Sequence, residues 1–352
     1  MLAAVLLGLR PGAAAPSDTA SFGTARTNGF SELSRAFVTL AIQGDLSGAS
    51  ALFEHSVGAG DAGAALRTQF DDRFLKPYER SAAFRAASGP AHDVALLYRV
   101  YWRQNLLREV DAAVAEARLS RALEDLLRAR AIEAPADSTP ERLTARLLED
   151  AGWHYSVSAT PPWRDLFVWQ TEEVRRYRVE LTDVSVPVEV VFMDDFAAQG
   201  WKDFASLGLA STTGWVENDR LYCVAWAYDT QSENFEVSYL KHEARHLADL
   251  RRYPDMDTVE LEYRAKLTEL AFASQDLQRI WNDFRAKAAD NPSSAHALAN
   301  WRVVRDLEAA LAVGGSPGAM AAWDPDRVNR AARRLLRENT IANSRNRAAA
   351  SR

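Results

Sequence analysis

The segment His242–His246 has the sequence HEARH and lies in a stretch, Val237 to Leu250, whose apolar residues recur at helical spacing. Residues four apart on a helix lie on one face, one turn above the other, so His242 and His246 are expected to bind one zinc ion through one imidazole nitrogen each. Glu243 lies about 100° further round the helix, within reach of a water on the metal without being a ligand. Such a site needs a third protein ligand and leaves a fourth position open. The alternative is a solvated helix face whose histidines happen to be four apart.

The segments on either side of the motif have the composition of a strand and of a second helix. Residues 220–228 are rich in aromatic and β-branched side chains, which is typical of a strand, and residues 229–232 are typical of a turn. Pro254 is expected to end the first helix, because the residue before a proline disfavours helical geometry. A second helical pattern begins at Val259 and continues to about Ala288.

The second helix is expected to supply the third ligand. Its candidates are Glu260, Glu262 and Glu269, since the stretch contains neither His nor Cys. We favour Glu262, because the small residue Ala265 lies three positions further on and lets two helices approach closely. The same step from Glu260 reaches a bulky tyrosine, so Glu260 is the reserve. Glu269 lies seven residues after Glu262 on the same face and is a candidate partner for a ligand instead.

The motif followed after fifteen residues by Glu262 resembles the gluzincin branch of zinc metallopeptidases, over roughly residues 215–275. The resemblance implies a zincin-like domain that binds Zn²⁺ through His242, His246 and Glu262, with Glu243 as general base. It also implies a peptide or protein substrate. The metzincin pattern is excluded because residues 247–251 contain neither the His nor the Gly that it requires.

Two features differ from the usual gluzincin pattern. The interval to the glutamate is shorter than in thermolysin-like enzymes, and Lys266 occupies a position that is often acidic. The carboxylate that orients a histidine ligand is therefore expected to come from elsewhere, with Asp249 and Glu269 as candidates.

In the expected chemistry, zinc activates water and polarises a carbonyl, while Glu243 takes the water proton and delivers it to the leaving amine. A further donor for the oxyanion is needed. The candidates are Tyr222, Tyr228, Tyr239, Tyr263 and Arg245, although a surface ion pair is an equally good interpretation of Arg245. The strand at 221–228 either binds an extended peptide along its edge or belongs to the core.

The composition is that of a folded chain that does not bind nucleic acid. Of the 352 residues, 47% are apolar and 26% are charged. The net charge of −6 and the absence of a dense basic patch argue against a nucleic-acid partner. The single cysteine, Cys223, excludes an intramolecular disulfide and is interpreted as a small buried hydrophobic residue.

The N-terminal apolar run Leu2–Leu9 has the length of a signal-peptide core and is followed by small residues at 12–15, although no basic residue precedes it. It favours a periplasmic or secreted protein, and a cytoplasmic one if the run is not a signal peptide. The run is too short to span a bilayer, so no stable membrane insertion is expected.

We expect a mostly helical α+β fold. Residues 1–20 are assigned to the possible signal peptide and lead, 21–150 to a helical domain, 151–340 to the zincin-like domain and 341–352 to a polar tail. Short strands expected at 153–158, 166–169, 177–181 and 186–192 form a small mixed sheet before the HExxH helix. The sequence thus predicts a zinc-dependent hydrolase, most specifically a metallopeptidase. The alternative is a non-catalytic helical interaction or scaffold protein with a structural or idle zincin-like domain. The oligomeric state is not predicted.

Overall fold

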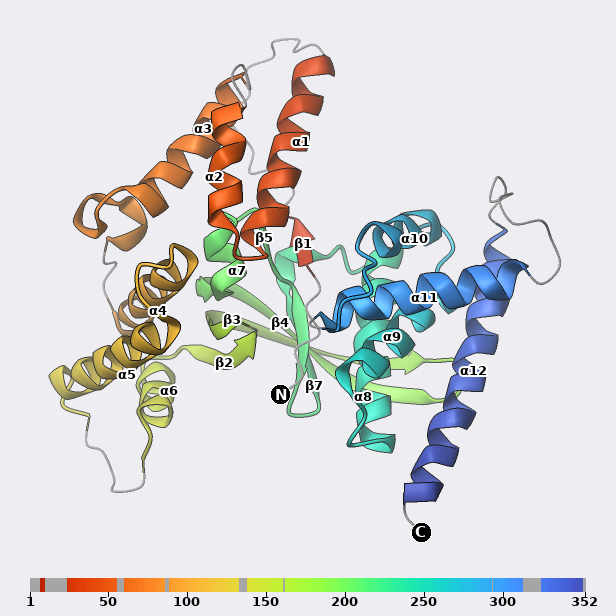
Figure 1. The fold of residues 1–352 in the computed structure, drawn as a ribbon. Coiled ribbons are helices and arrows are strands. Elements are labelled where there is room, and N and C mark those ends of the chain that lie inside the picture. The colour runs from red at the N-terminus through yellow and green to blue at the C-terminus, as the bar shows by residue number, and fades with distance from the viewer. Residues whose placement is uncertain are drawn as a thin grey trace. The chain divides into compact units, whose positions relative to one another are not determined.

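A computed structural model describes residues 7–9, 24–55, 60–85, 89–132, 138–160, 162–292, 294–312 and 324–350. It has many helices and a small five-stranded sheet in the order β2-β3-β4-β7-β6, which confirms the predicted mostly helical α+β fold (Figure 1). The chain divides into two compact units. No described helix combines the length and the apolar character that crossing a bilayer requires. Of the expected signal peptide and lead, only Leu7–Leu9 is among the described residues.

The N-terminal unit consists of residues 7–172 and 193–213. Its core is built from apolar faces of successive helices, with Phe37, Phe70, Tyr98 and Trp102 buried in one cluster. Thr139 caps α6, because its side chain accepts the N–H of Arg142 and Pro140 follows at the first helical position. The elements of this unit are β1 Leu7–Leu9, α1 Thr24–Ala41, α2 Leu46–His55, α3 Gly60–Phe70, η1 Asp71–Leu75, η2 Tyr78–Arg80, η3 Ala82–Phe84, α4 Pro90–Leu106, α5 Ala112–Ala129, α6 Pro140–Asp150, β2 His154–Thr160, α7 Gly200–Ala205 and β5 Ala210–Thr212.

The C-terminal unit consists mainly of residues 173–192 and 214–352 and contains the HExxH motif. One core cluster lies between its strands and α8, and a second lies among the helices from α9 to α12. The elements of this unit are β6 Gly214–Glu217, β7 Arg220–Val224, η4 Ala225–Ala227, η5 Asn234–Lys241, α8 His242–Arg252, α9 Thr258–Phe272, α10 Leu277–Ala286, α11 Ala295–Ala312 and α12 Pro325–Ala350.

Two long strands, β3 (Trp163–Glu180) and β4 (Ser185–Gln199), pass through both units. The second and third predicted strands are therefore one strand, and the polar residues between them do not interrupt it. The helical region expected at 21–150 lies in the N-terminal unit, which also includes residues 151–172 and 193–213.

The helix predicted from Val259 to about Ala288 is two helices, α9 and α10. The break follows from Glu233, whose carboxylate accepts the main-chain N–H groups of Ser274 and Asp276 and so satisfies donors at the start of α10. α12 continues as far as Ala350, through most of the polar tail expected at 341–352.

Cys223 lies on β7 and is fully buried, as its interpretation as a small hydrophobic residue requires. Burial raises the pKa of its thiol. The residue belongs to the cluster that packs β4, β7 and α8 together.

Candidate metal centre

The two histidines of the motif lie at the start of α8, directly after the π-helix η5. His242 and His246 are one turn apart, and their ring centroids are 4.8 Å apart at an interplanar angle of 79°. Both are buried, with 1% and 4% of the residue surface exposed. The local spacing thus brings the imidazoles together on the inner face of the helix.

Glu262 on α9 meets both histidines. Its Oε1 lies 3.4 Å from His246 Nε2, and its Oε2 lies 3.8 Å from His242 Nε2. One ligand atom from each of the three residues lies within 4.8 Å of the others. A tetrahedral zinc with bonds of about 2.0–2.2 Å places its ligand atoms about 3.3–3.6 Å apart, so small side-chain movements would accommodate the ion.

Glu269 contacts His242 at the ring nitrogen that faces away from Glu262. Its Oε1 is 2.7 Å from His242 Nδ1. A carboxylate only accepts hydrogen bonds, so Nδ1 carries the proton and Nε2 keeps its lone pair. His242 Nε2 is buried and has no hydrogen-bond partner, which is the state expected of a metal-binding nitrogen. Of the two carboxylates considered for orienting a histidine, Glu269 has this contact.

Asp249 instead binds two buried arginines. Its Oδ1 accepts Arg245 at 3.0 Å and Arg264 at 3.0 Å, and its Oδ2 accepts Arg264 Nε at 2.7 Å. Arg245 also reaches Asp183 at 2.6 Å, in the turn between β3 and β4. Arg245 does form an ion pair, as one interpretation expected. The pair is not at the surface, however, because Arg245 is only 1% exposed.

Glu260, the reserve ligand, faces other partners. Its carboxylate binds Arg302 at 2.8 Å on α11 and accepts the side-chain amides of Asn339 and Asn343 on α12. These contacts occupy both of its oxygens, whereas Glu262 and Glu269 are the glutamates of α9 that contact the histidines.

His296 and Lys266 complete the surroundings of Glu262, and their role was not predicted. His296 Nδ1, at the start of α11, lies 2.9 Å from Glu262 Oε2, and Lys266 Nζ lies 3.6 Å from the same oxygen. His296 is the more exposed, with 39% of its side chain accessible. The available signal was its rarity, because the chain has only six histidines.

Glu243 is fully buried, and neither of its carboxylate oxygens has a hydrogen-bond partner. Burial raises the pKa of Glu243 to about 8, and the neighbouring His246 works in the opposite direction. A cation in the adjacent site would favour the ionised carboxylate.

The three ligand candidates have shifted pKa values that reflect their mutual contacts. Burial lowers the pKa of His242. Burial alone would also lower the pKa of His246, but the Glu262 carboxylate outweighs this effect and raises the pKa of that ring. Burial is likewise outweighed at Glu262, whose pKa is held well below its usual value by His296 and His246.

Among the tyrosines considered as oxyanion donors, two have hydroxyl groups that are already engaged. The Tyr239 hydroxyl donates to the Tyr222 carbonyl at 2.9 Å, and the Tyr263 hydroxyl donates to Asp306 at 2.9 Å. The Tyr222 ring stacks on Trp215, and the Tyr228 ring packs against Tyr239. Arg245 is held by two carboxylates, Asp183 and Asp249.

Comparison of the chain with models of known protein families, with curated proteins and with solved structures returns no match. The function must therefore be inferred from the side chains at the centre.

Asp249→Asn is expected to destabilise the protein by about 3–5 kcal/mol, because it leaves Arg245 and Arg264 buried without a full countercharge. Urea unfolding gives the free energy. The matched control is Asp183→Asn, since Asp183 binds Arg245 but is 28% exposed, and its loss should cost about 1 kcal/mol. Equal losses in the two variants would contradict the central role of Asp249.

Glu269→Gln is expected to weaken zinc binding about 10- to 100-fold while leaving the fold intact, because the amide orients His242 less well and is uncharged. Competition with a chromophoric chelator measures the affinity. Glu260→Gln is the control on the same helix and should bind zinc as the wild type does. An unchanged affinity in Glu269→Gln would refute the orienting role.

Proposed function

We propose that this protein is a zinc-dependent hydrolase, most specifically a metallopeptidase that acts on peptides or proteins with Glu243 as general base. The observation that carries the proposal is the convergence of His242, His246 and Glu262, which are brought from two helices into one buried group. Histidine nitrogens and a glutamate oxygen are the donor set of many catalytic zinc sites.

The surroundings support a metal rather than a simple buried hydrogen-bond network. In such a network, buried polar atoms are satisfied by one another. Here His242 Nε2 and both oxygens of Glu243 are buried without a hydrogen-bond partner. A cation between the ligands would compensate these atoms. When bound, zinc would supply a Lewis acid that activates water and polarises a substrate carbonyl.

The side chains around the three ligands would have separate roles in this reaction. Glu243 follows His242 directly and is not among the three converging ligands, so its carboxylate is available to accept a proton from the attacking water and to return it to the leaving amine. Glu269 fixes the tautomer and orientation of His242. His296 and Lys266 hold the carboxylate of Glu262 through Oε2.

A second candidate is a structural zinc site in an interaction protein without catalytic activity. It is favoured by the burial of the three ligands and of Glu243, none of which is more than 4% exposed. Structural zinc sites have four protein ligands, whereas catalytic ones keep a position open. The two candidates differ in whether Glu243 is needed for any measurable reaction.

The wild-type protein is expected to contain close to one zinc per chain, as measured by elemental analysis after dialysis. His242→Ala and Glu262→Ala should each lose the metal, because two ligands bind zinc far less tightly than three. Glu260→Ala should retain it and serves as the control on α9. Retention in Glu262→Ala would exclude Glu262 as the third ligand, and no zinc in the wild type would refute the centre.

Glu243→Gln should retain zinc and stability but lower the hydrolysis of a quenched-fluorescence peptide library about 10²- to 10⁴-fold, because the amide cannot accept the water proton. Glu236→Gln, a change of the same chemistry at an exposed position on η5, is the control. Undiminished turnover in Glu243→Gln would refute the mechanism. A zinc-loaded wild type that cleaves no peptide would favour the structural site.

A further inference from the structure

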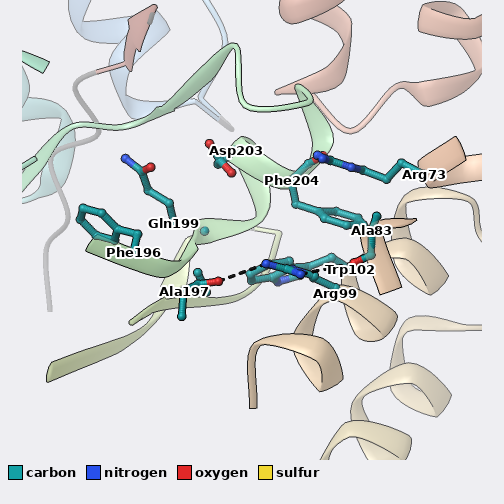
Figure 2. A pocket seen from close by; sticks show the side chains of 11 residues that line it. Arg73, Ala83, Arg99, Trp102, Phe196, Ala197, Gln199, Asp203 and Phe204 are labelled. Carbon is teal, nitrogen blue, oxygen red and sulfur yellow. Dashed lines mark hydrogen bonds between the residues drawn. The ribbon is translucent and has the colours of Figure 1, made fainter. Parts of the chain in front are cut away.

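A small cavity of about 190 Å³ lies within the N-terminal unit. One wall is formed by η1, η3 and α4, and the other by the end of β4 together with α7 (Figure 2). Arg73 and Arg99 project from the first wall, and Asp203 and Gln199 belong to the second. All of these residues belong to one compact unit, so the cavity is independent of the metal centre.

The two guanidinium groups are held in place by main-chain carbonyls. Arg73 donates to the Phe204 carbonyl at 2.7 Å, and Arg99 donates to the carbonyls of Ala83 at 3.3 Å and Ala197 at 3.1 Å. Arg73 also lies over the Phe204 ring, 5.1 Å from its centroid. Each guanidinium has five N–H donors, so these bonds orient the groups and leave donors for a ligand.

The positive charge of the cavity exceeds its negative charge. Asp203 is the only carboxylate among its lining residues, against two arginines. Asp72 is the other carboxylate that influences Arg73, but it already binds Lys76 Nζ at 2.8 Å and the Ala82 N–H at 2.9 Å. Burial lowers the pKa of both Arg73 and Arg99, and Arg99 lowers that of Arg73 further. Two partly desolvated cations therefore share one countercharge.

The remaining lining is suited to a compact organic group. Trp102 and Phe204 are buried and line the cavity with the arginines, and Figure 2 shows the Trp102 ring next to Arg99. Gln199 is held by its amide, which donates to Ser211 at 3.1 Å. Preformed arginines beside aromatic rings recognise planar oxyanions, because the guanidinium fork matches carboxylate and phosphate geometry.

We infer that this cavity is a binding site for a small anion bearing a carboxylate or phosphate group, which Arg73 and Arg99 bind from one wall. The ligand restores the charge balance that Asp203 alone does not provide. A volume of about 190 Å³ suits a group of a few heavy atoms, such as a short dicarboxylate or a phosphate.

The test is calorimetric titration of the full-length protein with succinate and, separately, with inorganic phosphate, at constant ionic strength set with sodium chloride. We expect saturable binding of at least one probe, and the preferred probe identifies the carboxylate or the phosphate as the ligand group. Arg99→Met and Arg73→Met should each weaken binding about tenfold or more, because a charge-assisted pair of hydrogen bonds is lost.

Asp203→Asn is expected to change anion affinity in the opposite direction. It also leaves in place both arginines, which support the fold. Removing its negative charge should tighten anion binding several-fold. Arg146→Met, at an exposed position on α6, is the control and should leave binding unchanged. His242→Ala should also bind the probe as the wild type does. Failure of the metal-site proposal can therefore be distinguished from failure of the anion-site inference. No binding of either probe, or equal binding in wild type, Arg99→Met and Asp203→Asn, would overturn the inference.

Discussion

The buried carboxylate of Asp249 joins the elements that carry the candidate metal centre. It binds Arg245 on its own helix and Arg264 on α9, and Arg264 continues to Asn339 and Thr340 on α12. Charges are costly to bury, and they are retained here because every charge in the group has several partners. His246 precedes Asp249 by less than one turn, and Glu262 precedes Arg264 by two residues. The ion pairs of Asp249 and the group of His242, His246 and Glu262 thus both link α8 to α9.

α9 has buried residues on all sides, from Leu261 to Ala271, and uses each side for a different purpose. Glu262 and Glu269 face the histidines, Arg264 faces Asp249, and Glu260 faces α11 and α12. Glu260, Arg264 and Glu269 thus each have charged or polar partners within the protein. This arrangement accounts for the charged residues that α9 buries, such as Glu262, Arg264 and Glu269.

The parts of the centre that the sequence predicted are the local ones. Four-residue spacing within one helix was enough to pair His242 with His246, and the small residue Ala265 distinguished Glu262 from Glu260. No hydrophobic stripe could help with that choice, because α9 is buried all round. His296 could not be predicted, since its contact with Glu262 depends on how α11 packs. The break between α9 and α10 was missed for the same reason, because its cause is the distant Glu233. In the N-terminal unit, Arg73, Arg99 and Asp203 are far apart in the chain, and only the tertiary fold brings them to one cavity.

The burial of Cys223 has a practical consequence for spectroscopy. It is the only cysteine in the chain, and its thiol is inaccessible and resists ionisation. Maleimides and spin labels react with exposed thiolates, so the native protein should be left unmodified under mild labelling conditions. A cysteine introduced at any exposed position would then be the single reactive thiol, without prior mutation of the core. Pairs of such labels, one in each compact unit, would report the distance between the units in solution.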